Sequence, residues 1–207
     1  PVAGVDRNDP LYRAAANGRL HLVVHDLDQL IAVSELAGRV GVSMPVHVQL
    51  DTGLSRGGER AENAAKIVER IITSSRVRLS GVMTHFSSPG DDPAQTDEQW
   101  NLFQRFVDQV SPMLKAAAAN GHNPALVAPR GGAASGGIAE LELHAANSCG
   151  AFRSRRYHGT MVRIGEALFG MVGGAVWGKA GPGIEGMEFA AEAESIEPAV
   201  RWTSTVS

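Results

Sequence analysis

The chain has 207 residues, with 19 lysines and arginines against 22 aspartates and glutamates, so its formal net charge is −3. This near balance argues against a nucleic-acid-binding or membrane-surface protein, because both usually carry a basic excess, and no apolar run is long enough to cross a bilayer. Apolar residues make up 43% of the chain, which is typical of a globular protein, and the single cysteine, Cys149, excludes an intramolecular disulfide and favours a cytoplasmic location.

Short apolar runs alternate with stretches of helical periodicity along the chain. The apolar runs predict strands at residues 20–24, 46–51, 79–86, 143–148 and 161–165. The helical stretches predict helices at residues 27–40, 59–72 and 96–119. Asp26 and Thr96 are the expected N-caps of the first and third helices. This alternation predicts an α/β fold built from βαβ units, with a mainly parallel sheet and right-handed crossovers.

Two connections differ from the rest in composition. Residues 120–140 are rich in Gly, Ala and Pro and predict a surface insertion. A second glycine-rich stretch covers residues 170–187, and from Pro198 onward apolar and polar residues alternate as in an antiparallel strand. We therefore expect the chain to pass from the α/β domain into a second domain of β type.

Polar side chains gather where the predicted strands end. They are Asp51, Thr52, Arg56, His85, Asn147, Ser148 and Arg163, with Gly165 directly after the last strand. In parallel α/β folds, functional groups collect at the carboxyl ends of strands. Each residue also has a structural interpretation, as a turn residue, a helix cap or a buried hydrogen-bonded histidine. Arg163 is the hardest to explain structurally, since its charge needs an acceptor or a ligand.

The histidines do not suggest a metal centre. His21, His25, His47, His122, His144 and His158 show no paired metal-type spacing, and the chain has one cysteine. We therefore expect no metal site.

Four motifs in this order resemble those of alanine racemase, a fold-type III pyridoxal-phosphate enzyme. LDTGLSRGG is similar to the family's K-x-D-T-G-M-x-R-x-G signature, and GVMTHF to G-x-x-T-H-F. HAANSCG is similar to H-x-A-N-S-A, and TMVRIGEALFGM to N-M-V-R-x-G-I-A-x-Y-G. The resemblance implies a partial TIM-type (β/α)8 barrel, strands four to eight, followed by the first strand of a C-terminal β domain.

The resemblance also implies boundaries and missing parts. Residues 1–170 would be the C-terminal part of the barrel that binds pyridoxal phosphate, 171–197 a linker, and 198–207 the start of the truncated β domain. The family's cofactor lysine would lie upstream of Pro1, and its catalytic tyrosine beyond Ser207, serving the partner subunit. We therefore expect a homodimer with shared active sites, no nucleic-acid or membrane partner, and no activity from this fragment alone.

The resemblance assigns roles to the retained residues. Ser148, Asn147 and the amides of Gly165 and Glu166 would hold the cofactor, chiefly its phosphate. Arg163 would face the pyridine nitrogen and keep it unprotonated, because a guanidinium donates without giving up its proton.

Two further residues of the retained site complete these assignments. His85 would link Arg163 to the partner's tyrosine and so join Arg163 and Arg56 among the catalytic residues; it would also contact the cofactor. Arg56 would bind the substrate carboxylate near the phenolic oxygen of the cofactor.

One departure from the family pattern affects the expected substrate. Gln49 stands where the signature has a lysine that is carbamylated in some members, so Arg56 loses an anionic neighbour. The expected function is interconversion of L- and D-alanine for peptidoglycan synthesis, by two-base proton transfer. A serine or broad-specificity racemase, and a non-catalytic protein that binds pyridoxal phosphate on the same barrel, are the alternatives.

Overall fold

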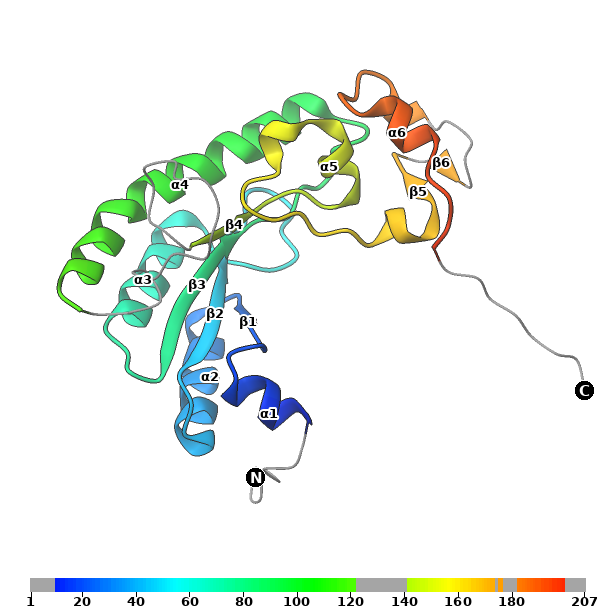
Figure 1. The fold of residues 1–207 in the computed structure, drawn as a ribbon. Helices are drawn as coiled ribbons and strands as arrows, with labels where there is room; N and C mark the ends of the chain where they lie inside the picture. The colour runs from blue at the N-terminus through cyan, green and yellow to red at the C-terminus, as the bar shows by residue number, and fades with distance from the viewer. Residues whose placement is uncertain (1–9, 122–140, 174, 177–181, 200–207) are drawn as a thin grey trace, which may run out of the picture. The chain divides into compact units, whose positions relative to one another are not determined.

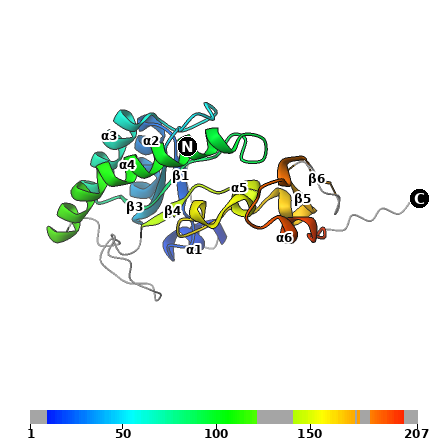
Figure 2. The ribbon, with the colours of Figure 1, turned by 90° about the horizontal axis from the view of Figure 1, so that it is seen from above.

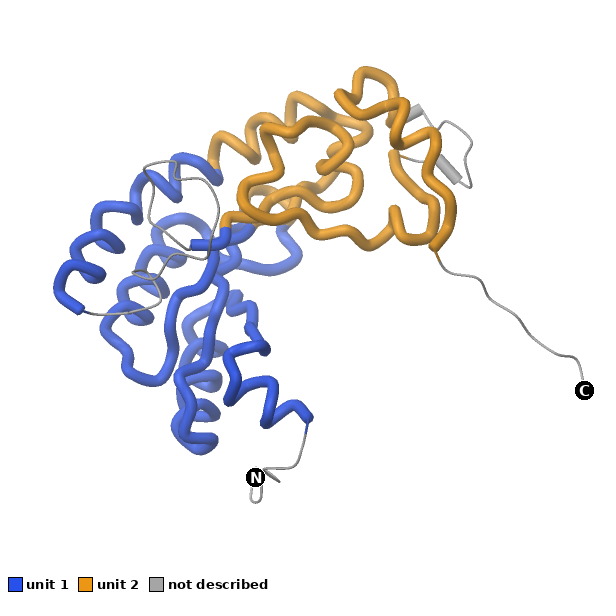
Figure 3. The backbone as a smooth tube through the Cα atoms, in the orientation of Figure 1, with its two compact units in different colours: residues 1–51, 55–83, 103–142 blue, residues 52–54, 84–102, 143–207 orange. Residues whose placement is uncertain are grey.

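The computed structural model describes residues 10–121, 141–173, 175–176 and 182–199, and these residues form two compact units (Figure 3). The first contains residues 1–51, 55–83 and 103–142, and the second contains residues 52–54, 84–102 and 143–207. Both the predicted insertion at 120–140 and the terminal strand predicted from Pro198 lie almost wholly outside the described residues. Each unit is therefore described by itself.

The first unit is built on parallel strands, and the strand order β1-β2-β3-β4 of the sheet follows the chain. The strands are β1 (Leu22–Val24), β2 (Met44–Gln49), β3 (Val77–Met83) and β4 (Glu142–His144), of which β4 crosses the boundary of the unit. β1 pairs in parallel with β2, and β2 with β3, with a register shift between Val46 and His47. All of β2 is buried, as expected for a central strand of a parallel sheet.

Three helices follow strands as the periodicity predicts: α2 (Leu27–Val40), α3 (Ala61–Ile72) and α4 (Pro93–Ala119). A further helix, α1 (Pro10–Ala16), precedes the sheet and was not predicted. Figures 1 and 2 show α2 and α3 on the same side of strands β1 to β3. Asp26 caps α2, its Oδ1 accepting from the amide of Gln29 at 2.7 Å, as predicted.

The start of α4 differs from the prediction. The helix begins at Pro93 rather than after Thr96, and its cap is Asp92, whose Oδ1 accepts from the amide of Gln95 at 2.8 Å. Thr96 lies inside the helix and donates to the carbonyl of Asp92. Proline is well suited to a first helical position, because its missing amide hydrogen would have no partner there.

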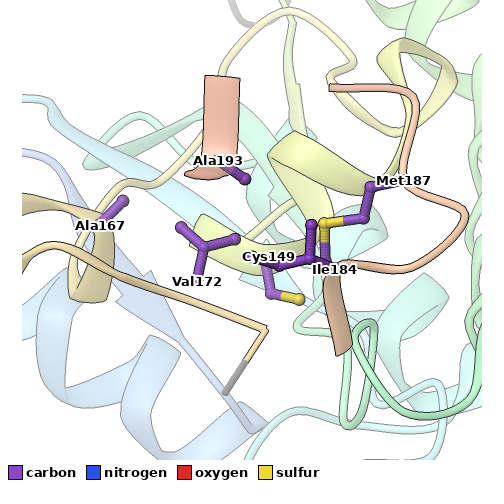
Figure 4. Close-up of a cluster of buried hydrophobic side chains, with 6 residues drawn as sticks. All are labelled: Cys149, Ala167, Val172, Ile184, Met187 and Ala193. Atoms are coloured by element: carbon purple, nitrogen blue, oxygen red, sulfur yellow. The ribbon is translucent and has the colours of Figure 1, made fainter. Parts of the chain in front are cut away.

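The second unit consists of short elements. They are α5 (Ser148–Arg153), η2 (Arg155–Tyr157), η3 (Glu166–Phe169), the antiparallel strands β5 (Met171–Val172) and β6 (Ala175–Val176), η4 (Pro182–Ile184) and α6 (Ala190–Glu194). Six buried side chains pack at its centre (Figure 4): Cys149, Ala167, Val172, Ile184, Met187 and Ala193. The stretch predicted as a linker, 171–197, therefore contributes to a local core.

Arg153 holds the loops of this unit together. Its guanidinium, 7% exposed, donates to the backbone carbonyls of Pro89, Gly90, Gly183 and Glu185 at 2.7 to 3.0 Å. A buried guanidinium needs such acceptors, and four carbonyls satisfy it without a carboxylate.

The strand predicted at 161–165 is absent: residues 161–164 are irregular and end at a bend at Gly165. The segment still runs beside the end of β4, because the amide of Thr160 donates to Leu143 and that of Arg163 to Ala146. Two isolated hydrogen bonds do not make a ladder, so the apolar run MVRIG is not a strand. It nevertheless places Arg163 beside the segment that follows β4.

Candidate cofactor site

Arg163 is the centre of a polar cluster in the second unit. Its Nη1 donates to Nδ1 of His144 at 2.8 Å and to the carbonyl of the same residue at 3.0 Å. Its Nη2 donates to the carbonyls of Thr84 at 2.8 Å and Ala145 at 3.2 Å, and lies 3.3 Å from Nδ1 of His85. Five acceptors on two amino groups fix the plane of the guanidinium.

Arg163 remains positively charged in this environment. Burial lowers its pKa from 12.5 to about 10, because a partly desolvated cation is harder to keep protonated. The lowered pKa is still well above neutral pH, so the guanidinium is a permanent donor. Within the described residues, its Nε–H makes no hydrogen bond that competes with a ligand.

The two histidines beside Arg163 are acceptors toward it. A guanidinium can only donate, so Nδ1 of His144 carries the lone pair and the proton of the neutral ring lies on Nε2. His85 also accepts at Nδ1, and its Nε2 lies 3.3 Å from Nδ2 of Asn147. The sequence analysis predicted His85 here but treated His144 only as a possible metal ligand.

Asn147 is oriented by the start of α5. Its Oδ1 accepts from the amide of Gly150 at 2.9 Å, and its Nδ2 donates to the carbonyl of Phe86 at 3.3 Å. The residue is therefore the N-cap of α5, which was the structural interpretation of the sequence. The same orientation directs its amide nitrogen to His85.

Ser148 joins the segment after Arg163 to α5. Its Oγ accepts from the amide of Gly165 at 2.9 Å and from that of Ala167 at 3.3 Å, with Glu166 between them. A Cβ built on Gly165 would have nothing within 4 Å, so there is open space beside this backbone. A hydroxyl and successive amides beside open space form an arrangement suited to an anion.

Arg56 lies in the first unit, so it is described separately from the cluster around Arg163. It is exposed and lines an open pocket of about 300 Å³ with His25, Asp26, Gln29 and residues 57–59. Nδ1 of His25 is buried there and has no hydrogen-bond partner among the described residues.

Asp51 and Gln49 each make a hydrogen bond with the loop that carries Arg56. Oδ1 of Asp51 accepts from the amide of Ser55 at 3.0 Å, in a turn where Ser55 has a φ of 54°. Nε2 of Gln49 donates to the carbonyl of Gly57 at 2.9 Å. Thr52 is buried in the second unit and bonds Thr84 at 2.7 Å.

Of the predicted site residues, the structure thus brings together His85, Asn147, Ser148, Arg163, Gly165 and Glu166 in one unit. Sequence reasoning missed His144 and the backbone carbonyls that orient Arg163. The signal for His144 was present, since it is the first residue of the HAANSCG motif. The carbonyls had no sequence signal, because every residue carries one.

A parallel sheet whose strands are followed by helices defines a protein of the α/β class. The family model described as alanine racemase, N-terminal domain, matches residues 3–139, and the chain belongs to the alanine racemase family. The resemblance found in the four sequence motifs is thereby confirmed.

Individual relatives agree with this assignment. The chain is 30% identical over 148 residues to an alanine racemase 2 of Clostridium acetobutylicum, covering 70% of this chain and 32% of that protein. It is 33% identical over 82 residues to an alanine racemase of Halothermothrix orenii, covering 39% of this chain and 22% of the relative. The chain therefore spans about a fifth to a third of the length of these relatives.

Solved structures support the same fold. An alanine racemase of Clostridium difficile in complex with cycloserine has a TM-score of 0.63 at 18% identity, covering 95% of this chain and 44% of that one. An alanine racemase of Bartonella henselae with covalently bound pyridoxal phosphate has a TM-score of 0.54 at 17% identity, covering 79% of this chain and 39% of that one. Among the helices described here, none combines the length and apolar character of a membrane span.

Proposed function

We propose that this chain supplies the cofactor-holding part of a pyridoxal-phosphate-dependent amino-acid racemase, whose substrate pair is L- and D-alanine. The observation that carries the proposal is the Arg163 guanidinium, charged and oriented by five acceptors with its Nε–H left for a ligand. Membership in the alanine racemase family and the covalently bound pyridoxal phosphate of the Bartonella henselae relative support the choice of cofactor.

The residues of the second unit fit this cofactor at two points. The amides of Gly165 to Ala167 and the hydroxyl of Ser148 offer donors for a phosphate, beside the open space at Gly165. Ser148 now accepts from the amides of Gly165 and Ala167, so a phosphate would replace its oxygen there. Nε–H of Arg163 offers a donor for the pyridine nitrogen.

Arg163 also determines what happens at that nitrogen. Pyridoxal phosphate, when bound, supplies an electron sink that acidifies the α-hydrogen of an amino acid. Since the pKa of Arg163 is about 10, the guanidinium holds its proton rather than passing it to the ring. Arg163 would therefore donate a hydrogen bond to a pyridine nitrogen without protonating it, an arrangement that suits prompt return of an α-proton more than side reactions.

His85 and His144 act on Arg163 rather than on a substrate. Both present a lone pair to its amino groups, and Asn147 in turn orients His85. The general bases of the reaction are expected to be a lysine upstream of this sequence and a tyrosine of the partner subunit. Homodimer formation is thus part of this proposal.

The test uses the complete protein that contains this chain, loaded with pyridoxal phosphate. Conversion of L-alanine to D-alanine is followed by chiral chromatography, and cofactor binding by its visible absorbance. We expect both cofactor binding and conversion of L-alanine to D-alanine. Cofactor binding without turnover of any amino acid would favour a non-catalytic barrel protein, and the absence of cofactor binding would refute the proposal.

Gln49 favours a second candidate, a serine or broad-specificity racemase. Its side chain donates to Gly57, so it offers Arg56 no anionic partner, and Arg56 is exposed. The neutral Gln49 in place of a charged neighbour changes the surroundings of Arg56, which the resemblance places beside the substrate carboxylate. L-serine is therefore tested in parallel, together with Gln49→Lys. A serine rate equal to or above the alanine rate, with a shift toward alanine in Gln49→Lys, would establish the second candidate.

A further inference from the structure

Three side chains that the proposed function does not use meet in the first unit. His21 directly precedes β1, His47 lies within β2, and Glu142 begins β4. His47 is 4% exposed, and the Glu142 side chain is 37% exposed. The cluster therefore has a buried end and an end open to solvent.

The donor atoms are spaced as ligands of one ion. Nδ1 of His21 lies 2.9 Å from Nε2 of His47, which lies 3.6 Å from Oε2 of Glu142. All the ligand atoms lie within 4.8 Å of one another. Tetrahedral zinc with bonds of about 2.0–2.1 Å places neighbouring ligand atoms about 3.3 Å apart, so small movements would complete the geometry.

Backbone contacts orient both rings. Nε2 of His21 lies 3.3 Å from the carbonyl of Gly18, which assigns the proton to Nε2 and leaves the Nδ1 lone pair facing His47. Metal-bound histidines typically donate their second nitrogen to a carbonyl in this way. Gly81 leaves room for the His47 ring, since a Cβ there would lie 2.3 Å from its Nδ1.

Both imidazoles would bind a metal as neutral ligands, and the carboxylate of Glu142 would supply the negative charge.

We propose that His21, His47 and Glu142 form a binding site for a divalent transition metal of the zinc class, with one coordination position left to water. Two imidazoles and one carboxylate are the donors that zinc prefers, whereas magnesium and calcium take oxygen ligands. The sequence analysis expected no metal site because it searched for short spacings. These ligands are 26 and 95 positions apart along the chain and meet through the sheet.

The test is equilibrium dialysis of the chain against Zn²⁺, with metal content measured by mass spectrometry and Mg²⁺ as the negative control. Co²⁺ is used in parallel, because its visible d–d absorption reports coordination by protein ligands. The variants are His47→Gln and Glu142→Gln. His158→Gln is the matched control, since His158 lies in the second unit, where its Nε2 contacts the carbonyl of Ala151.

The expected result is one equivalent of Zn²⁺ in the parent chain and in His158→Gln, with affinity at least about 10-fold weaker in both cluster variants. Circular dichroism first establishes that each variant is folded. If His47→Gln does not fold, the Zn²⁺ affinity of Glu142→Gln tests the proposal, because the side chain of Glu142 is partly exposed and its replacement should not prevent folding. No Zn²⁺ binding above the Mg²⁺ level, or unchanged affinity in the folded cluster variants, would overturn the proposal. Equal loss in His158→Gln would overturn it as well.

Discussion

At the scale of the residue, Arg163 combines a permanent charge with a fixed orientation. Carbonyls from Thr84, His144 and Ala145 accept from its two amino groups, so the side chain cannot turn toward another partner. A lysine could keep the charge, but its single amino group cannot reach the same acceptors in one plane. The function of this residue therefore depends on shape as much as on charge.

We expect Arg163→Lys to lower racemase turnover in the complete protein on the order of 10²-fold, because a preorganised donor is lost. Unpaired carbonyls should also lower the free energy of unfolding by about 1–3 kcal/mol. Steady-state kinetics and urea denaturation measure the two effects. Arg155→Lys, at an exposed residue of η2, is the control and should leave both unchanged. Equal turnover in the two variants would contradict the role of Arg163.

Cys149 reports the packing of the second unit. Burial raises the pKa of its thiol from 9.0 to about 11, so the thiol is neutral at pH 8. We expect iodoacetamide to label it slowly in the native chain and much faster in urea, followed by mass spectrometry. Because the unfolded thiol ionises at lower pH than the folded one, raising the pH above about 9 should favour unfolding of this unit. Native labelling as fast as in urea would contradict the buried position.

At the scale of the element, local signals predicted the order of helices and strands better than their boundaries; the strand expected at 143–148, for example, is Glu142–His144. Asp26 caps α2 as expected because a cap needs only its own side chain and the next turn. The prediction of Thr96 as a cap was wrong. Asp92 caps the helix instead, because it directly precedes a proline that occupies the first helical position. The strand at 161–165 was wrong because a strand depends on a neighbour's ladder, which the apolar run by itself cannot specify.

The turn before Arg163 depends on a glycine. Gly159 has a φ of +59°, and a Cβ there would lie 2.1 Å from the carbonyl oxygen of Leu143. Gly41 is the matched control, because it ends α2 at a φ of +74° and has nothing within 4 Å of its Cβ position. Both glycines adopt the left-handed conformation, but only Gly159 also lacks space.

We expect Gly41→Ala to lower the free energy of unfolding by about 1 kcal/mol, which is the usual cost of a non-glycine residue in this conformation. Gly159→Ala should cost roughly 3 kcal/mol or more, because a backbone oxygen has to move as well. Urea denaturation of both variants measures the difference. Similar losses would show that the contact with Leu143 relaxes without cost.

At the scale of the whole molecule, the sequence predicted the family but not the long-range polar contacts. Three of the four motifs place a polar side chain after a described strand, and the fourth places Arg163 beside the segment that follows β4, so each position could be predicted one motif at a time. The clustering of His21, His47 and Glu142 depends on which strands pair, so it could not be predicted from residues that lie far apart in the sequence. The five acceptors of Arg163 were hidden for the same reason.

The sheet leaves β1 as an edge among the described strands. β1 pairs with β2 on one side, and Val23 in its centre is 41% exposed. An apolar edge strand is a template for pairing with another chain. We therefore expect the chain by itself to associate as its concentration rises, and Val23→Lys to reduce the association. Sedimentation velocity over a concentration series measures this.

Leu102→Lys is the control for the prediction on Val23. Leu102 is 43% exposed, but it lies on helix α4, whose backbone groups are already paired within the helix. If exposed apolar area alone drives association, both lysine variants should reduce it equally. If the unpaired backbone of β1 drives it, Val23→Lys should act much more strongly. A parent chain that stays monomeric at every concentration would contradict the prediction outright, since the edge would then be protected.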